Sequence, residues 1–384
     1  MPNKPNFPIT ISDISADWLE SRLNDGFPGA KVQDCSVMQI GQGEGFMAAL
    51  ARVMLTGESS EGSLPHSVIV KLSSPMEATR QLAARMNYYG REIGFYRDCA
   101  GDCGVKVPRC YSAESVEEDN RFAMIIEDLA PASPVDQVEG CSFEESAKVM
   151  RAFADLHAHW WNSPKLKSIG WPSPITHVQP ASESLALLEA SIIDAEKTGR
   201  FDAYPNMKRL LPLLPPLCKM EPPPPFPYTL VHGDLRSDNI FFPDDSADPV
   251  IIDWQTSGMG QPMTDIARWL TQSITIETRR SHEQELLTIY HDRLVERGVT
   301  QYTKKQMISD YELNLVVTLL MFSMSMDEID QSSDRAAVLF DAMYSRLEAA
   351  LEDWNVEKIL KILPLLIPIF KITTWFKMTF SKET

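Results

Sequence analysis

The stretch HGDLRSDN, residues 232–239, decides the fold, together with IIDWQ at residues 251–255. Both stretches adjoin short apolar runs with the composition of strands, so their polar side chains are expected at strand ends, where loops present side chains to a cleft. Asn239 and Asp253 lie 14 residues apart, and a short strand–turn–strand connection would bring their oxygen atoms to one Mg²⁺ ion. Asp234 would then lie beside that ion, where it can accept the proton of an alcohol.

The same spacing is typical of the kinase catalytic loop, H-x-D-x-x-x-x-N, which is followed by a metal-binding aspartate. Two positions differ from that pattern. Gly233 replaces the arginine of the loop, and Asp253 is followed by Trp254 rather than by phenylalanine. The structural alternative is a β-hairpin whose polar ends are only solvated. We favour the catalytic interpretation because the histidine, the asparagine and both aspartates occur at the required intervals.

Two features near the N-terminus fit an ATP site. Gly41, Gly43 and Gly45 alternate between two expected strands, and glycines let the backbone approach phosphate without a Cβ clash. Lys71 stands near the end of the apolar strand SVIVKLS at residues 67–73, like the kinase lysine that meets the α- and β-phosphates. Each feature alone is also typical of an ordinary hairpin or of a strand with an edge lysine. Their order along the chain favours nucleotide binding.

The helix expected over residues 76–99 offers a partner for Lys71. In kinases a helix glutamate pairs with the third-strand lysine and keeps it extended. Glu77 and Glu92 compete for this role, and Glu92 is favoured because the apolar residues that follow it predict an inward-facing helix surface. A solvated helix charge is the alternative interpretation.

The order of patterns along the chain predicts an α+β protein with two lobes. Residues 1–129 show strands with one long helix inserted after the third strand, which is typical of a small antiparallel-sheet lobe. Residues 130–384 are mostly helical and include a capping box at Ser142 and Glu145. The hinge between the lobes is expected at about residues 126–132.

The composition restricts the classes of partner that the protein can be expected to bind. The 384 residues carry a net charge of −17, so most of the surface should repel nucleic acid and anionic membranes. The N-terminus shows no apolar region typical of a secretory signal, which favours a cytoplasmic location. The apolar tail at residues 359–376 is broken by lysine and proline, and its run from Ile362 to Phe370 is too short to span a bilayer, so no transmembrane segment is expected. Packing on the large lobe is favoured for this tail, with a weak membrane-surface contact as the alternative.

The motifs resemble those of the aminoglycoside phosphotransferase and choline kinase superfamily, and more closely those of its ecdysteroid-kinase-like branch. The resemblance follows the family's order along the chain and implies a two-lobed, protein-kinase-like fold. The motifs are GQGEGF (41–46), VIVKL (68–72), REIGFY (91–96), VPRCY (107–111), IIEDL (125–129), LHAHWW (156–161), HGDLRSDNIFF (232–242) and IIDWQ (251–255).

The resemblance also implies a role for each matching residue. Asp234 resembles the catalytic aspartate, His232 the residue that positions its loop, and Asp265 a structural acid that fastens the loop. Arg236 stands where a cation could meet the γ-phosphate. The nucleotide and metal positions are Gly41, Gly43 and Gly45 over the phosphates, Lys71 and Glu92 as the phosphate-holding ion pair, Glu127 and Leu129 at the adenine edge, and Asn239 and Asp253 on the metal.

We therefore expect a kinase that uses ATP and Mg²⁺ and acts on the hydroxyl group of a small molecule. The absence of an A-P-E segment after Asp253 argues against a protein kinase. A steroid or another lipophilic alcohol is the favoured acceptor, and an aminoglycoside or a choline-type substrate is the alternative. A nucleotide-binding regulator without catalysis is the alternative from another class.

Overall fold

The computed structural model describes residues 7–41, 47–60, 62–116, 120–172, 181–216, 218, 227–243, 248–325, 334–354 and 356–361. The chain divides into two compact units. Unit 1 contains the described residues up to Ser133 together with those in Phe241–Ser246 and Val250–Thr256, and unit 2 contains the others. The two later segments of unit 1 therefore lie within the range that the sequence assigns to the large lobe.

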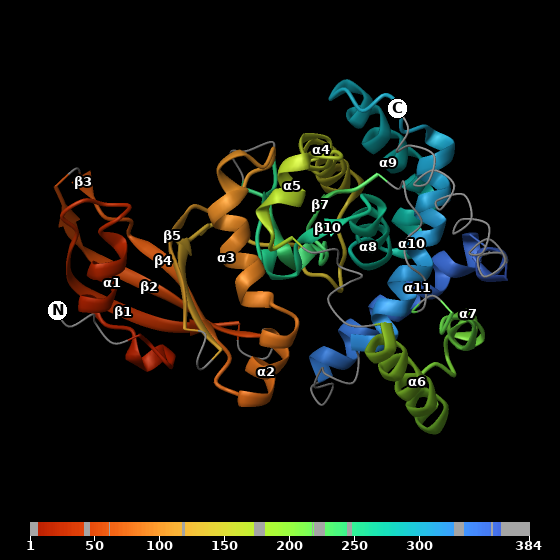
Figure 1. The fold of residues 1–384 in the computed structure, drawn as a ribbon, viewed down its shortest axis with the longest axis horizontal. Coiled ribbons are helices and arrows are strands. Elements are labelled where there is room, and N and C mark those ends of the chain that lie inside the picture. Colours follow the sequence, from red (N-terminus) through yellow and green to blue (C-terminus); the bar gives the residue numbers. More distant parts are fainter. Residues whose placement is uncertain are drawn as a thin grey trace, which may run out of the picture. The chain divides into compact units, whose positions relative to one another are not determined.

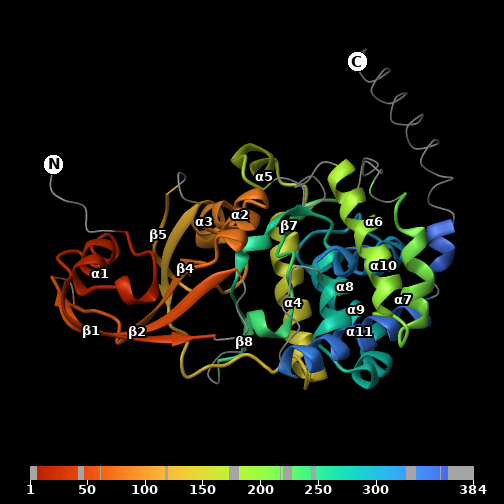
Figure 2. The same ribbon diagram turned by 90° about the horizontal axis from the view of Figure 1, so that it is seen from below.

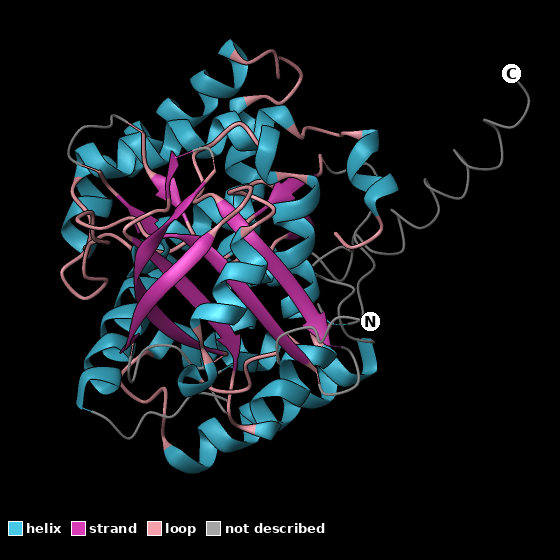
Figure 3. Cartoon of the chain, turned by 90° about the vertical axis from the view of Figure 1, so that its left-hand side faces the viewer, coloured by secondary structure: helices cyan, strands magenta, loops and turns pink. Residues whose placement is uncertain are grey.

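Unit 1 is built on one antiparallel sheet with the strand order β1-β2-β4-β6-β5, and the short β3 pairs with β2 (Figures 1 and 3). The strands are β1 (Lys31–Ile40), β2 (Ala48–Ser59), β3 (Gly62–Ser63), β4 (Ser67–Ser73), β5 (Cys110–Val116) and β6 (Arg121–Glu127). Apolar and β-branched residues dominate β4 and β6, which suits strands that are paired on both edges.

Alternation along β4 decides where its lysine points. Val68, Val70 and Leu72 belong to a buried core that also contains residues of helix α1 (Ala16–Leu23). Successive side chains of a strand point to opposite faces of the sheet. Lys71 therefore lies on the face opposite α1.

That opposite face is covered by two helices, α2 (Glu77–Arg85) and α3 (Tyr88–Asp98), where the sequence predicts one helix over residues 76–99. The prediction of a single long helix is wrong. The break lies at Asn87, whose φ of 54° is left-handed. Asparagine adopts this conformation more readily than most residues, so the helix is interrupted without glycine or proline. The break places the two candidate glutamates in different helices.

Unit 2 is mostly helical, as the sequence predicts. Its first long helix, α4 (Phe143–His159), begins with the predicted capping box of Ser142 and Glu145. The other helices are α5 (Pro164–Ile169), α6 (Ala181–Thr198), α7 (Pro205–Leu210), α8 (Met263–Gln272), α9 (Ile276–Glu296), α10 (Lys304–Ser325) and α11 (Asp334–Trp354). α4 packs against α9, while α8 packs against α10 and α11 (Figure 2). Among the helices in the described ranges, none combines the length and apolar content needed to cross a bilayer.

Two small sheets frame the predicted site residues. β7 (Thr229–Val231) pairs with β10 (Gly258–Gly260), and β8 (Ile240–Phe241) pairs with β9 (Val250–Ile251). The loop at residues 232–239 joins β7 to β8, and the second predicted stretch follows β9. These short strands agree with the apolar runs in the sequence.

Candidate active site

Lys71 lies at the centre of a buried ion cluster within unit 1. Its ammonium Nζ donates to both carboxylate oxygens of Glu92, at 2.9 and 2.8 Å, and to Oδ1 of Asp253 at 2.7 Å. The three residues come from β4, from α3 and from the segment after β9. Lys71 is 7% exposed and Glu92 is 1% exposed. Of the two competing glutamates, it is Glu92 that pairs with the lysine.

The cluster keeps Lys71 charged. Burial alone would lower the pKa of Lys71, but the carboxylates of Asp253 and Glu92 outweigh burial and raise the pKa above its ordinary value. Burial raises the pKa of Glu92 to about 7, against the opposing effect of Lys71. Once Glu92 is ionised, one ammonium faces two carboxylates. The resulting excess of negative charge suits the binding of a cation.

The backbone around Asp253 is tightly fixed. Asp253 itself has a φ of 63°, a left-handed conformation that few residues other than glycine adopt. The buried ring of Trp254 stacks on Phe95 of α3, with ring centroids 3.8 Å apart, and its indole N–H donates to the carbonyl of Ile251 at 3.1 Å. Because α3 also carries Glu92, this stacking holds Asp253 beside the helix that supplies the other carboxylate. Such strained backbone is typical of functional sites.

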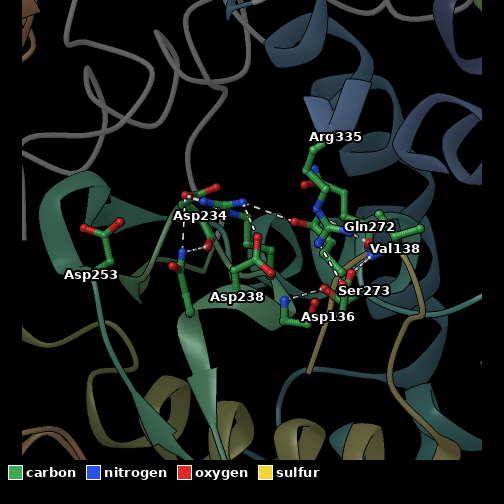
Figure 4. Close-up of polar contacts among 12 residues, drawn as sticks. Asp136, Val138, Asp234, Asp238, Asp253, Gln272, Ser273 and Arg335 are labelled. Carbon is green, nitrogen blue, oxygen red and sulfur yellow. Dashed lines mark hydrogen bonds and ion pairs between the residues drawn. The ribbon is translucent and has the colours of Figure 1, made fainter. Parts of the chain in front are cut away.

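Asp234 is the centre of a second ionic cluster, formed within unit 2 (Figure 4). Its Oδ1 accepts a hydrogen bond from Arg268 Nη2 at 2.5 Å, and its Oδ2 accepts one from Arg236 Nε at 3.3 Å. Asn239 donates its amide Nδ2 to the main-chain carbonyl of Asp234 at 2.9 Å and to Oδ2 at 3.3 Å. Arg236 is shared between two acids, because its Nη1 also donates to Asp238 at 2.8 Å.

The two guanidinium groups keep Asp234 ionised. Burial would raise the pKa of Asp234, but Arg268 and Arg236 outweigh burial and hold the pKa well below its usual range. A carboxylate of this kind is a weak base but a strong hydrogen-bond acceptor. It can orient a hydroxyl group. It can take up the hydroxyl proton only after the hydroxyl oxygen has begun to form a new bond with its electron pair.

Asp265 at the start of α8 fixes the backbone of the loop. Its two carboxylate oxygens accept the main-chain N–H groups of His232 and Gly233, both at 2.8 Å. The buried imidazole of His157 lies 3.2 Å from the same carboxylate. His232 in turn accepts the N–H of Asp234 on its ring Nδ1 at 3.2 Å. These contacts are what the roles implied by the resemblance require of Asp265 and His232.

Asn239 and Asp253 offer the donor chemistry that Mg²⁺ prefers. The amide nitrogen of Asn239 is committed to Asp234, which leaves the amide oxygen for a cation. Within the described ranges, no group of three or more His, Cys, Asp or Glu residues could hold a metal ion. Asn239 belongs to unit 2 and Asp253 to unit 1, so their joint binding of Mg²⁺ stays a prediction.

The glycine-rich stretch is described only in part. Gly41 directly follows β1 and has a φ of 65°, a left-handed conformation that favours glycine. Gly43 and Gly45 lie outside the described residues. A role over the phosphates stays a prediction for all three.

The predicted adenine edge is anchored at Asp128, which belongs to the motif IIEDL but has no role assigned to it from the sequence. The Asp128 carboxylate accepts two hydrogen bonds from Arg52, at 2.7 and 3.0 Å, and one from the Ser67 hydroxyl at 2.7 Å. These bonds tie the end of β6 to β2 and β4. The neighbouring Glu127 and Leu129 are the residues expected to meet adenine through their backbone, and that role stays a prediction.

Arg268, the residue nearest the Asp234 carboxylate, is also absent from the sequence predictions. A signal for it does exist, because Arg268 follows Asp265 by three residues within α8. Helix residues three apart lie on the same face. An acid that fastens the catalytic loop therefore brings a cation of the next helical turn to that loop.

Two family models match the chain. Residues 42–161 match the Ecdysteroid kinase-like family. The predicted resemblance to this family is confirmed. The ecdysteroid-kinase-like match includes Lys71 and Glu92. Residues 226–361, which include Asp234 and Asp253, match a family described as "Uncharacterized oxidoreductase dhs-27".

Two curated relatives come from Caenorhabditis elegans. "Uncharacterized oxidoreductase dhs-27" is 21% identical over 433 residues, which cover 100% of this chain and 52% of the relative. "Uncharacterized kinase-like protein D1044.1" is 24% identical over 275 residues, which cover 65% of this chain and 67% of the relative. This chain thus spans about half the length of the first relative.

A solved structure from Ralstonia eutropha, provisionally described as an aminoglycoside phosphotransferase, has a similar fold. It superposes with a TM-score of 0.53 at 17% identity, over 88% of this chain and 97% of that chain. At this identity the likeness shows the fold alone. The predicted α+β, protein-kinase-like fold is confirmed.

Proposed function

We propose that this protein transfers the terminal phosphoryl group of ATP to a hydroxyl group of a small molecule. The observation that carries the proposal is the meeting of Lys71 with Glu92 and Asp253, which bridges positions 182 residues apart. Kinases use a strand lysine, a helix glutamate and a metal-binding aspartate to hold the phosphates of ATP. The match of residues 42–161, which include Lys71 and Glu92 but not Asp253, to the ecdysteroid-kinase-like family supports the same assignment.

In this proposal Lys71 binds the phosphates of ATP. Its ammonium is charged and is held on one side by the buried carboxylate of Glu92. Incoming phosphate oxygens can replace the Asp253 carboxylate as its second partner, which leaves Asp253 available for a metal. We assign Asn239 and Asp253 to Mg²⁺, which when bound would neutralise phosphate charge.

Asp234 orients the acceptor hydroxyl and finally takes its proton. Phosphoryl transfer through a loose transition state requires positioning and charge neutralisation more than a strong base. The low pKa of Asp234, caused by Arg268 and Arg236, suits that requirement because the carboxylate stays anionic. Arg236 is the cation nearest to this acid along the chain and remains the residue that we assign to the γ-phosphate.

A lipophilic alcohol such as a steroid is our favoured acceptor. The support is the match of residues 42–161 to the ecdysteroid-kinase-like family. An aminoglycoside or a choline-type amino alcohol is the alternative within the same reaction class.

The experiment that tests the function measures ADP release by the purified protein with ATP, Mg²⁺ and a panel of sterols, aminoglycosides, amino alcohols and hydroxy acids. We expect one class to stimulate ADP release, and we expect Asp234→Asn to reduce the stimulated rate by about 10²- to 10⁴-fold.

Asp155→Asn is the matched control. Like Asp234, Asp155 accepts hydrogen bonds from two arginines, Arg293 and Arg297, both at 2.7 Å, but it lies on α4 and its arginines stand at the end of α9. We expect this variant to keep its turnover. ADP release that no acceptor stimulates, or that is equally high in Asp234→Asn, would contradict the proposed function.

A further inference from the structure

Arg346 on α11 is a buried cation that bonds to two other segments of unit 2. It is 5% exposed. Its Nη1 donates to the main-chain carbonyls of Gln137 at 2.6 Å and Gln272 at 2.7 Å, and its Nη2 donates to that of Val138 at 2.8 Å. Gln272 is the last residue of α8, where unpaired carbonyls attract a cation. Arg346 thus joins α11, the end of α8 and the turn at Gln137.

Burying such a cation is costly, and the local sequence is adapted to it. The desolvation of an arginine costs several kcal/mol unless its donors find partners. Gly140 allows the close approach, because a Cβ atom there would lie 3.1 Å from Arg346 Nη2 and 3.2 Å from the Thr275 nitrogen. Gly140 also has a φ of 80°, which favours glycine.

Two further hydrogen bonds extend from this junction to the catalytic loop. The Gln137 side chain is fully buried, and its Oε1 accepts a hydrogen bond from Arg236 Nη1 at 3.1 Å. Ser273, next to the end of α8, accepts the main-chain N–H of Ser237 on its hydroxyl oxygen at 3.0 Å. The side chain of one loop residue and the backbone of the next are therefore both held by segments that Arg346 joins.

We propose that Gln137, Ser273 and Arg346 form a brace that sets the position of the catalytic loop, with Gln137 as the positioning residue for Arg236. The proposal rests on the proposed function, because it concerns the placing of Asp234 through Arg236. Gln137 orients the Arg236 guanidinium from one side while Asp238 holds it from another. A brace of this kind acts on turnover, because small displacements of positioned groups cost rate even when substrates still bind.

The first test compares two substitutions at Gln137. Gln137→Leu removes the acceptor for Arg236, whereas Gln137→Glu keeps it. Both substitutions lose the donation from Gln137 Nε2 to the carbonyl of Gln272 at 3.3 Å, so their comparison isolates the bond to Arg236. We expect Gln137→Leu to lower kcat about tenfold to a hundredfold with KM for ATP nearly unchanged, and we expect Gln137→Glu to stay near the wild type. Equal losses in both variants, or a wild-type kcat in Gln137→Leu, would overturn the positioning role.

The second test does not depend on activity. Amide hydrogen exchange is followed over residues 232–241 in the wild type, in Arg346→Met and in Arg335→Met. Arg335 is the matched control, because it also lies on α11 and pairs with the same turn through Asp136 at 2.7 Å, but it is half exposed. We expect faster exchange in the loop for Arg346→Met alone. Unchanged exchange in Arg346→Met, or the same increase in Arg335→Met, would overturn the brace.

The two readouts separate the proposals. A wild type that phosphorylates no acceptor contradicts the proposed function, and the exchange measurement then still decides whether the brace holds the loop. A wild type with full activity and a loop that is unaffected in Arg346→Met contradicts the brace alone.

Discussion

The two aspartates of the proposed site are neutralised in different ways. Asp253 in unit 1 shares a single ammonium, that of Lys71, with Glu92. Asp234 in unit 2 receives two guanidinium groups, those of Arg268 and Arg236. A lysine is a compact point charge that can change partners, whereas arginine forms directed contacts that hold a carboxylate in place.

The charge balance of the two clusters differs accordingly. The cluster around Lys71 has one cation for two carboxylates once Glu92 is ionised. The cluster around Asp234 also includes Asp238, which pairs with Arg236 and brings two carboxylates against two guanidinium groups. An acid in a cluster with surplus negative charge is suited to bind a cation, and an acid in a balanced cluster is suited to remain an oriented anion. The difference supports the proposed assignment of Asp253 to the metal and of Asp234 to the hydroxyl group.

The largest effect expected from this comparison is on stability, in the lysine cluster. Lys71→Met leaves the carboxylates of Glu92 and Asp253 without their cation, and breaking a buried ion pair from one side costs about 3 to 5 kcal/mol. The double variant Lys71→Met with Glu92→Gln removes one of those charges and should regain part of the loss. Urea denaturation of both variants measures the difference. A double variant less stable than the single one would contradict the buried pairing.

A smaller effect is expected on pH dependence, in the arginine cluster. Arg268 and Arg236 lower the pKa of Asp234, so removal of Arg268 should let burial raise it. Because Asp234 must be ionised, the acid limb of the kcat/KM profile should move to higher pH by about one to two units in Arg268→Met. Arg236→Met should move it less, since the Arg236 contact is longer and shared with Asp238. Of the other groups in contact, His232 also lowers this pKa. Identical profiles for wild type and Arg268→Met would disprove the assignment.

The lysine cluster could be predicted from the sequence because each part of it follows a local rule. The alternation of apolar residues in β4 turns Lys71 away from the core, and Glu92 lies in a helix whose neighbours are apolar. The apolar residues that follow Glu92 favour it over Glu77 as the partner of Lys71, and the structure shows this pairing. The break at Asn87, which places the two glutamates in different helices, could not be predicted, because no glycine or proline marks it in the sequence.

The arginine cluster could be predicted only in part. The motif names Asp234, Arg236 and Asn239, since they follow one another in the loop. Arg268 and Gln137 reach the same place from other elements. The position of Arg268 three residues after Asp265 is a local signal for it, whereas nothing local in the sequence indicates Gln137. Contacts between segments that are far apart in the chain depend on the tertiary fold, which periodicity and motif spacing do not report.

The most direct measurement is a calorimetric titration of Asp253→Asn and Asp234→Asn with ATP, each with and without Mg²⁺. We predict that Asp253→Asn loses the magnesium-dependent gain in affinity for ATP and that Asp234→Asn keeps this gain. The same gain in both variants, or its loss in both, would contradict the proposal that Asp253 binds the metal while Asp234 orients the hydroxyl group.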